Sequence, residues 1–400
     1  MPSKDVAIIG VGQSSFVRGY EGSIKELAFE AFREAMQDAK ITQKDVDASI
    51  FCSAPEYDKQ RSPAGVMAEY LGLIPQPTFY LENVCSSSSQ GVKVAYSMIK
   101  AGLHDLVVVC GFQKMSEISS AESQERMGRG ADIQWESPFG TMMPGYYALY
   151  AQAYMAANGL TLDDLMSVRI KSGTYGQINE RAVYRKGVSA ADFDPTNEKA
   201  RMWGPVASPL RVGDCCANAD GSSCIILASA DRAKALCEKP IWIMGLGAAS
   251  AAVNMPGRPD FTKGLQGPHL ASAEAYKMAG ITAADVDVAE VHDCFTITEM
   301  VIMEDLMFSE RGKAPDDVRS GFFHLDGGLP INTDGGLKCF GHPIGASGLR
   351  MIFEAWLQLR GDAPDERRIS TYGQRDLALV HNLGGYPGEM LSSITVLGSS

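Results

Sequence analysis

Near the start of the chain, apolar residues recur at intervals of three and four. This spacing predicts a helix over residues 24–39 with one apolar face, whose members are Ile24, Leu27, Ala28, Ala31, Phe32, Ala35, Met36 and Ala39. A short apolar stretch around Ile50 and Phe51 follows and is typical of a strand. Together these segments indicate a strand–helix–strand unit.

A similar pattern occurs again in the second half of the chain. Residues 39–54 and 279–294 align 240 positions apart with six of sixteen positions identical. A second correspondence keeps the same order, since Cys85, a helix over 90–102 and a buried strand over 105–111 match His342, a helix ending at 359 and a strand over 376–382. We interpret the two halves as an internal duplication; the alternative is a coincidence between two ordinary α/β units.

The alternation of helices with short, continuously apolar strands predicts an α/β fold with mostly parallel sheets covered by helices on both faces, which a duplicated body of five layers satisfies. The expected units are residues 1–116 with 208–235, an inserted loop domain over 117–207, and residues 236–400. The insertion is polar, is rich in Ser, Met and Tyr, and contains the basic residues Lys171, Arg181, Arg185 and Lys186. Because ligand sites in such folds gather on long insertions and at strand ends, we expect substrate recognition there.

Charge and cysteine usage narrow the classes of protein. The 400 residues include 36 Lys plus Arg and 48 Asp plus Glu, and the net charge of −12 disfavours nucleic acid and anionic membranes as partners. The N-terminus lacks the features of a signal peptide, and no apolar run reaches the roughly 18 residues of a membrane span. The nine cysteines include no CxxC pair, which favours free thiols over disulfides or structural zinc. We therefore expect a cytoplasmic protein without a metal site.

Three segments carry candidate chemistry. Cys85 precedes a predicted helix, whose N-terminal dipole favours a nucleophilic thiolate; the alternative is a small buried apolar residue. His342 lies in the glycine-rich segment GGLKCFGHPIGASG, where it can hold a thiolate, bind an oxyanion or stabilise a turn. His292 and Cys294 share one loop after a strand and form a proton donor and acceptor pair, unless Asp293 caps a helix and Cys294 merely packs.

Other motifs indicate less chemistry. The GVG segment at 10–12 lacks the third glycine of a dinucleotide-binding fingerprint. Adjacent Cys215 and Cys216 have a poor spacing for chelation and are interpreted as buried thiols. In the HNLGG segment (381–385), the His and Asn are interpreted as buried turn residues, whereas the glycines can bring backbone N–H groups into a site.

The segments NVCSSSS, HDCF, GGLKCFGHPIGASG and HNLGG occur in the order and approximate spacing of one known family. Along essentially its whole length the chain resembles the thiolase superfamily, and most closely its sterol-carrier-protein-type and archaeal-type thiolases, the branch that carries HDCF. The resemblance implies a duplicated thiolase fold with two similar, mostly parallel five-stranded sheets, helices in five layers and an inserted loop domain. The internal repeat agrees with that duplication.

The resemblance also implies roles for single residues. Cys85 matches the cysteine that becomes acylated, and His342 matches the histidine that activates it. His292 stands where many thiolases have the Asn of an NEAF segment, and with His342 it is expected to stabilise the oxygen of an enolate. The backbone N–H groups of Cys85 and Gly384 are expected to form a second oxyanion hole.

One departure from the family pattern affects the second catalytic thiol. Many thiolases carry this cysteine in a C-terminal CxG segment, and here that place reads Asn382-Leu383-Gly384. The HDCF branch is expected to have transferred the role, so acid/base chemistry is assigned to Cys294. Cys339, near His342 in the sequence, is a less favoured substitute.

The implied reaction is cleavage of a 3-oxoacyl-CoA by CoA through a Cys85 acyl-enzyme, or the reverse Claisen condensation. No bound cofactor is expected, because CoA is a co-substrate. Several loop-domain residues can line a pocket for a bulky or aromatic acyl group such as that of benzoylsuccinyl-CoA, or can form the loop domain's own core; they are Met142, Met143, Tyr146, Tyr147 and Tyr150. Acetoacetyl-CoA is the default small substrate.

Other functions and a partner subunit also fit parts of the sequence. The alternatives are a thiolase-like acyltransferase with a non-CoA acceptor, a non-catalytic subunit that binds acyl-CoA or lipid, and an aldolase without a nucleophilic cysteine. Retention of Cys85, His292, Cys294 and His342 together disfavours them. The family implies a homodimer, and HDCF relatives often work with a small partner that carries a zinc ribbon and an OB-fold and helps to bind CoA.

Overall fold

The computed structural model describes residues 5–54, 57, 60, 62–140, 142–254, 257, 260–370, 376–386 and 391–399. The strands of its main sheet are β1 (Val6–Gln13), β2 (Ala48–Cys52), β3 (Thr78–Leu81), β4 (Leu106–Lys114), β7 (Asp220–Ser229), β8 (Ile241–Ser250), β9 (Val288–Val291), β10 (Leu377–Gly384) and β11 (Leu391–Gly398). A separate pair joins β5 (Pro205–Ala207) to β6 (Leu210–Arg211).

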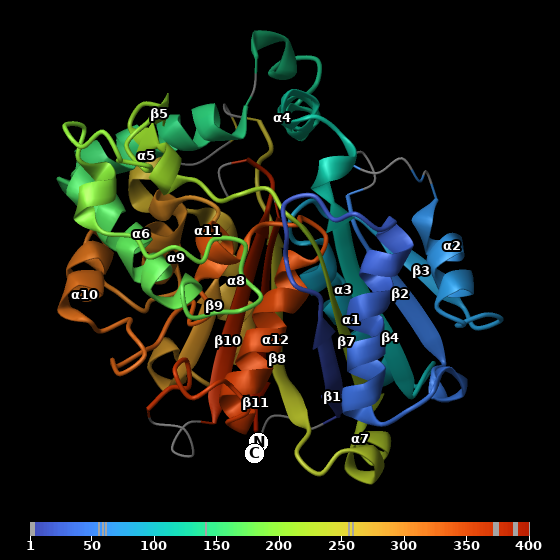
Figure 1. Ribbon diagram of the computed structural model, residues 1–400. Coiled ribbons are helices and arrows are strands. Elements are labelled where there is room, and N and C mark those ends of the chain that lie inside the picture. Colours follow the sequence, from blue (N-terminus) through green and yellow to red (C-terminus); the bar gives the residue numbers. More distant parts are fainter. Residues whose placement is uncertain are drawn as a thin grey trace.

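The helices lie mainly between and around these strands (Figure 1). They are α1 (Ile24–Ala39), α2 (Pro63–Tyr70), α3 (Ser87–Lys100), α4 (Ser120–Gly128), α5 (Met143–Asn158), α6 (Leu162–Gly176), α7 (Ala230–Leu236), α8 (Gln266–Ala279), α9 (Thr296–Asp305), α10 (Ala314–Ser320), α11 (Gly336–Phe340) and α12 (Ser347–Arg360). In the described ranges, none of the helices has both the length and the apolar character that crossing a bilayer requires.

The first predicted helix forms with the predicted ends. The Ser23 hydroxyl accepts a hydrogen bond from Glu26 N–H, and the Glu26 carboxylate accepts one from Ser23 N–H, so a capping box begins α1. A left-handed Lys40 ends it. The predicted apolar face is buried against β1 and β7, with Ile24 alone half-buried.

The internal repeat is visible in matching hydrogen bonds. After α1, Thr42 N–H donates to Asp45 at 2.9 Å, and after α8 Thr282 N–H donates to Asp285 at 2.7 Å. Asp47 then accepts two hydrogen bonds of 2.9 Å from backbone N–H groups at the start of β4. Its counterpart Asp287, 240 positions later, accepts two of 2.9 and 3.0 Å at the start of β10. The duplicated α/β fold predicted from the sequence is therefore confirmed.

The two expected sheets are joined into one nine-stranded sheet of order β3-β2-β4-β7-β1-β8-β11-β10-β9. In each half one strand, β7 or β11, runs antiparallel to its neighbours, while β2 pairs in parallel with β3 and β4, and β9 with β10. The junction is short and pairs Ala7 with Trp242 and Ile8 with Ile241. The sheets merge because β1 and β8 are edge strands whose free backbone groups meet.

The second half also lacks a full counterpart of β3 among the described residues. In the first half β3 pairs with β2 over four residues, whereas the equivalent edge of β9 carries one isolated bridge, from Ala289 to Ile331. The expected fifth strand of that half is therefore reduced to a single pair. The segment that follows it leads directly into α11 and the predicted His342 loop.

The layers follow from the helix contacts. α1 and α2 cover one face of the first half, and α8 covers the outer face of the second. α3 and α12 pack against each other and against strands of both halves, so they form the central layer. In Figure 1 the strands of the first half lie to the right and those of the second half to the left. The five predicted layers are present.

The expected loop domain over 117–207 contains α4, α5, α6 and β5. In Figure 1, α5, α6 and β5 lie at the upper left in green shades, and α4 lies near the top centre in teal. α6 packs against α9, α10 and α11 of the second half, and α5 packs against the 261–263 turn. The boundaries of the three expected units stay a prediction. This segment lies over the strand ends from which the candidate site is built.

Candidate active site

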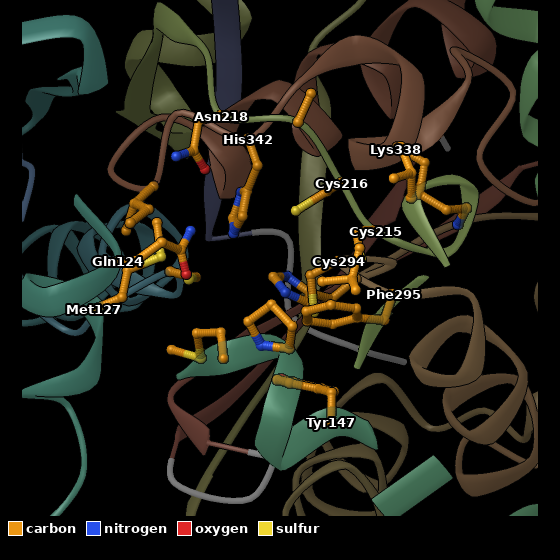
Figure 2. Close-up of a pocket in the computed structure, with 18 of the residues that line it drawn as sticks. Gln124, Met127, Tyr147, Cys215, Cys216, Asn218, Cys294, Phe295, Lys338 and His342 are labelled. Carbon is orange, nitrogen blue, oxygen red and sulfur yellow. The ribbon is translucent and has the colours of Figure 1, made fainter. Parts of the chain in front are cut away.

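A cavity of about 510 Å³ collects the residues predicted to carry chemistry (Figure 2). Cys85, His292, Cys294 and His342 all line it, although they come from three separate segments of the chain. Cys85 precedes α3, His292 and Cys294 follow β9, and His342 follows α11. The site thus gathers the carboxyl ends of strands and the starts of helices, as expected for an α/β fold.

Cys85 sits at a strained turn before α3. The preceding residue Val84 has a φ of 50°, a conformation that a β-branched residue rarely adopts. The Ser87 hydroxyl holds the turn, because it accepts from Asn83 N–H at 2.8 Å and donates to the Val84 carbonyl at 2.6 Å. The thiol therefore lies at the N-terminus of α3, whose dipole favours a thiolate.

His342 is held in one tautomer by Ser347. The Ser347 hydroxyl donates its proton to the Pro343 carbonyl at 3.0 Å, so it accepts from His342 Nδ1–H at 2.7 Å. His342 Nε2 then carries the lone pair, and it has no hydrogen-bond partner among the described residues. Burial, aided by the positive charge of Arg350, lowers the pKa of His342 to about 3. The ring is a neutral base that faces the cavity (Figure 2).

His292 is held in the opposite tautomer. Asn382 Nδ2 donates to His292 Nδ1 at 3.1 Å, and the Asn382 oxygen accepts from the Ser89 hydroxyl at 3.0 Å. The His292 proton must therefore reside on Nε2. Burial, with the neighbouring His342 as the next cause, lowers the pKa of His292 well below its usual value, so the ring is neutral. His292 thus presents a hydrogen-bond donor where His342 presents an acceptor.

Cys294 lies at the start of α9 beside Tyr147. Burial raises the pKa of the Cys294 thiol to about 12, although hydrogen bonds with Tyr147 and Thr298 act in the opposite direction. The Tyr147 ring stacks on Phe295 with a centroid distance of 4.3 Å. Cys294 is therefore a protonated thiol at neutral pH, held against an aromatic wall that Figure 2 shows on one side of the cavity.

A buried charge cluster joins two of the predicted segments. Lys338 Nζ pairs with Asp293 at 2.6 Å and also with Glu299, and Lys171 pairs with Glu299 at 2.7 Å. All four side chains are fully buried. Removing one partner of such a buried pair costs about 3–5 kcal/mol, so the cluster holds α11 against the HDCF segment. Lys338 and Asp293 belong to motifs named from the sequence, but their pairing was not predicted.

The predicted oxyanion glycines lie next to the Cys85 turn. A Cβ on Gly384 would come within 2.6 Å of the Asn83 carbonyl and 3.1 Å of Ser86 N, so the two backbones touch. The cavity itself is lined by the next residue, Gly385, which has a φ of 102°. The close approach requires glycine at position 384, and the positive φ favours glycine at position 385.

The predicted substrate residues separate into two groups. Met143 and Tyr147 line the cavity. Met142 is half exposed and borders a neighbouring hollow, Tyr146 packs on Tyr386 at 4.8 Å, and neither lines the cavity. Tyr150 is fully buried against Tyr154 and Phe261, so it belongs to the core of the insertion. Because α5 is apolar on several sides, its sequence did not indicate which tyrosine faces the substrate.

One interpretation from the sequence is changed. Cys215 and Cys216, expected as buried packing thiols, both line the cavity, because an isolated bridge from Cys215 to Phe295 brings them beside Cys294. Cys216 N–H donates to the Cys294 carbonyl at 2.8 Å. Cys339, the substitute for Cys294, is fully buried and does not line the cavity. His381 and Asn382 are buried as expected, but they lie within strand β10 rather than in a turn, and His381 Nε2 is 3.1 Å from the Ser392 hydroxyl.

Several cavity residues were not predicted as part of the site. Gln124 and Asn218 contribute amides, and four arginines line the same space, namely Arg18, Arg126, Arg169 and Arg201. They come from loops and helices far apart in the sequence, and no motif marks them. Only the packing of the insertion over the two halves brings them together.

Comparisons with known proteins show the family of the chain. Two protein-family models match, "Thiolase, N-terminal domain" over residues 6–170 and "Thiolase C-terminal domain-like" over residues 247–398. An "Acetyl-CoA acetyltransferase" of Methanothermobacter thermautotrophicus is 32% identical over 387 residues, covering 96% of this chain and 97% of that protein. Another, from Methanocaldococcus jannaschii, is 35% identical over 392 residues with the same coverage.

A solved structure described as "Ltp2-ChsH2(DUF35) aldolase" shares the fold, with a TM-score of 0.83 at 23% identity, and covers 100% of this chain and 98% of that one. Fold, cavity and relatives together define an enzyme of the thiolase-type acyltransferase class. The chain belongs to the thiolase family, and the resemblance found in its sequence is confirmed.

Proposed function

We propose that this enzyme cleaves a 3-oxoacyl-CoA with CoA, or catalyses the reverse Claisen condensation, through an acyl-enzyme on Cys85. The observation that carries the proposal is a pair of buried histidines, His292 and His342, beside two thiols in one cavity, with hydrogen-bond partners that assign the two rings opposite tautomers. A base, a hydrogen-bond donor, a nucleophile and a proton donor are the four groups that this reaction needs.

The first half-reaction begins at His342. Its Nε2 takes the proton of the Cys85 thiol, and the thiolate attacks carbon 3 of the substrate. We assign the oxygen of the tetrahedral intermediate to the backbone N–H groups of Cys85 and of Gly384 or Gly385, an assignment supported by the close approach of Gly384 to the Cys85 turn. As the bond between carbons 2 and 3 breaks, the electron pair moves onto the departing thioester as an enolate.

The enolate oxygen is bound by His292 Nε2–H and by the proton that His342 Nε2 has just gained. Cys294 gives its thiol proton to carbon 2, which releases the departing thioester (acetyl-CoA when carbon 2 is unsubstituted), keeps the shortened acyl group on Cys85 and leaves a Cys294 thiolate. The incoming CoA thiol then gives its proton to that thiolate and attacks the acyl group on Cys85. Acyl-CoA leaves, and the Cys85 thiolate recovers its proton from His342.

Burial explains why Cys294 suits this role. A thiol whose pKa is raised to about 12 stays protonated until a carbanion needs the proton. Once ionised, it is a strong base toward the CoA thiol. The position of Cys294 in the cavity, with the C-terminal CxG position occupied by Asn382-Leu383-Gly384, supports the assignment of acid/base chemistry to Cys294 rather than to Cys339.

The cavity supports an acyl group larger than acetyl. Its volume of about 510 Å³ is bounded on the apolar side by Met143, Tyr147, Phe295 and Ile344. We propose that a bulky or aromatic 3-oxoacyl-CoA fits this wall, with acetoacetyl-CoA as the small alternative. CoA is proposed as co-substrate, with the exposed Arg18 near its phosphates.

We also propose a homodimer and an additional partner subunit. Strand β3 forms one end of the nine-stranded sheet and exposes Phe79, so a second copy can extend the sheet there. The solved structure named above contains a second component, ChsH2(DUF35), which supports a small partner with a zinc ribbon and an OB-fold. Light scattering at micromolar concentration tests the dimer, which a monomeric mass contradicts.

Intact-protein mass spectrometry tests the acyl-enzyme. The protein is mixed with acetoacetyl-CoA or with an aromatic 3-oxoacyl-CoA, and the mass of any adduct identifies the acyl group. Cys85→Ala should abolish the adduct, whereas Cys237→Ala, at the end of α7 and outside the cavity, should retain it. An adduct that persists in Cys85→Ala contradicts the nucleophile, and the lack of any adduct in the wild type contradicts this reaction for the acyl groups tested.

Addition of CoA separates the remaining alternatives. A thiolase returns the acyl group to CoA, so the adduct should disappear as acyl-CoA forms. An adduct that survives excess CoA indicates a non-CoA acceptor. Tight acyl-CoA binding with no adduct at all indicates a binding subunit.

A further inference from the structure

Arg169 is a buried cation without a buried anion. It lies on α6, is 2% exposed and lines the cavity. Its Nη1 donates to Cys339 Sγ at 2.8 Å, and its Nε has no partner among the described residues. Within the described part of the chain, no carboxylate forms an ion pair with it. Burial of a guanidinium destabilises the fold unless an anion lies next to it. We therefore look to a bound ligand for the negative charge that pairs with Arg169.

The neighbouring cations are already compensated. Lys338 and Lys171 share Asp293 and Glu299, and Arg201 pairs with Asp192 at 2.6 Å. Cys339 does not supply the missing charge, since burial raises the pKa of its thiol. On this side of the cavity, Arg169 is therefore a cation that no carboxylate of the described residues pairs with.

Tyr184 completes a polar recess beside Arg169. The Arg169 guanidinium lies 5.0 Å from the centre of the Tyr184 ring, and that of Arg201 lies 5.8 Å away from it. The Tyr184 hydroxyl is buried and has no hydrogen-bond partner among the described residues, although its residue lines the cavity. A neutral O–H donor and a guanidinium edge are therefore both available to one anion.

We propose that Arg169 and Tyr184 bind a carboxylate carried by the acyl part of the substrate, which makes 3-oxoacyl-CoA esters with a second acid group the preferred substrates. This inference rests on the proposed thiolase reaction and names its substrate class. Benzoylsuccinyl-CoA, the bulky substrate considered from the sequence, carries such a carboxylate. The geometry suits the fork of an arginine, which binds a carboxylate through two N–H groups.

The depth of Arg169 favours a carboxylate over a CoA phosphate. Its guanidinium touches Cys339 on α11, the helix that also carries Lys338 and leads to His342, so it lies on the catalytic side of the cavity. A phosphate dianion needs more positive charge and more water than one buried arginine offers. Arg18, which also lines the cavity, is exposed and suits a phosphate at the entrance.

A matched pair of substrates tests the proposal. 3-Oxoadipyl-CoA ends in a carboxylate, and 3-oxohexanoyl-CoA has the same chain length and ends in a methyl group. The wild-type enzyme should show a higher kcat/KM for the acid. Arg169→Met should lower the ratio of the two values about 10- to 100-fold, as expected for loss of a charged hydrogen-bonded contact that only the acid can make.

Two further variants keep the test independent of folding defects. Tyr184→Phe removes one hydroxyl and should lower the same ratio by a smaller factor. Arg129→Met, which removes an exposed ion pair with Glu125 outside the cavity, should leave the ratio unchanged. The KM for CoA and the KM for 3′-dephospho-CoA are measured in each variant. If Arg169 bound the 3′-phosphate of CoA, Arg169→Met would make these two KM values equal.

The outcomes are distinct. Lack of a preference for the acid in the wild type, or equal loss of activity toward both substrates in Arg169→Met, overturns the carboxylate subsite. If Arg169→Met no longer discriminates between CoA and 3′-dephospho-CoA, Arg169 binds the phosphate, and the carboxylate subsite is overturned as well. If neither substrate acylates Cys85 in the wild type, the proposed reaction fails and the subsite fails with it, whereas acylation without preference overturns the subsite alone.

Discussion

The rings of His292 and His342 lie 5.3 Å apart at 77° to each other and carry their protons on opposite nitrogens. Each tautomer is set by a residue from a different element, Asn382 on β10 and Ser347 on α12. One imidazole is therefore ready to accept a proton while the other is ready to donate a hydrogen bond. After His342 takes the proton of Cys85, both Nε2 atoms become donors toward the same oxygen.

Ser347→Ala should lower kcat about 10-fold with little change in KM. The variant removes the hydroxyl that keeps the proton on His342 Nδ1. The proton can then move to Nε2, and in that tautomer Nε2 cannot accept the proton of Cys85. Ser272→Ala is the matched control, because Ser272 is an equally buried hydroxyl on α8 that bonds a backbone carbonyl and does not line the cavity. An unchanged kcat in Ser347→Ala contradicts the tautomer role.

Asn382→Asp should separate carbon–carbon cleavage from acyl transfer. A carboxylate only accepts, so it draws the His292 proton to Nδ1 and leaves no donor on Nε2 for the enolate. We expect thiolysis of a 3-oxoacyl-CoA to fall about 100-fold, the size of effect seen when one oxyanion donor is lost. Exchange of acetyl groups between acetyl-CoA and labelled CoA forms no enolate and should persist. Equal loss of both activities argues against a specific enolate role for His292.

Acid should destabilise the fold through its buried histidines. Burial lowers the pKa of His381 to about 3, far below that of an unfolded histidine, so the unfolded chain binds the proton first. The contribution of neutral His381 to the free energy of unfolding is fully present above pH 6.5 and is lost as the pH falls toward 3. Between pH 7 and 5, His381 should account for about 2 kcal/mol of lost stability. Urea unfolding at both pH values should show that His381→Gln loses less than the wild type; parallel losses contradict the assignment.

Gly345→Ala should destabilise the contact between the halves. A Cβ at Gly345 would lie 2.5 Å from the Phe112 carbonyl and 2.6 Å from Ser53 Cα, both backbone atoms of the first half. We expect a loss of about 1–3 kcal/mol, measured as a lower thermal midpoint. Gly145→Ala provides the control, since that glycine lies in α5 with nothing within 4 Å of the added carbon, and should be neutral or stabilising. Equal midpoints for the two variants count against close packing at Gly345.

The sequence by itself determined the local elements and the identity of the candidate catalytic residues. The three-and-four spacing of α1 and its capping Ser23 depend only on neighbours along the chain, so both helix ends follow from the residues. The repeated Asp47 and Asp287 make the duplication visible without a structure. Cys85, His292, Cys294 and His342 stand in motifs, and all four meet in one cavity.

Only the tertiary structure decided the surroundings of those residues. The bridge that joins β1 to β8, the placement of Cys216 beside Cys294, and the choice of Tyr147 over Tyr150 as a cavity wall all depend on contacts between distant segments. The same holds for the two histidine tautomers, which Ser347 and Asn382 determine across the fold. Periodicity predicts which residues share a face of a helix, but long-range packing decides what covers that face. Long-range packing also decides which charged groups surround Arg169.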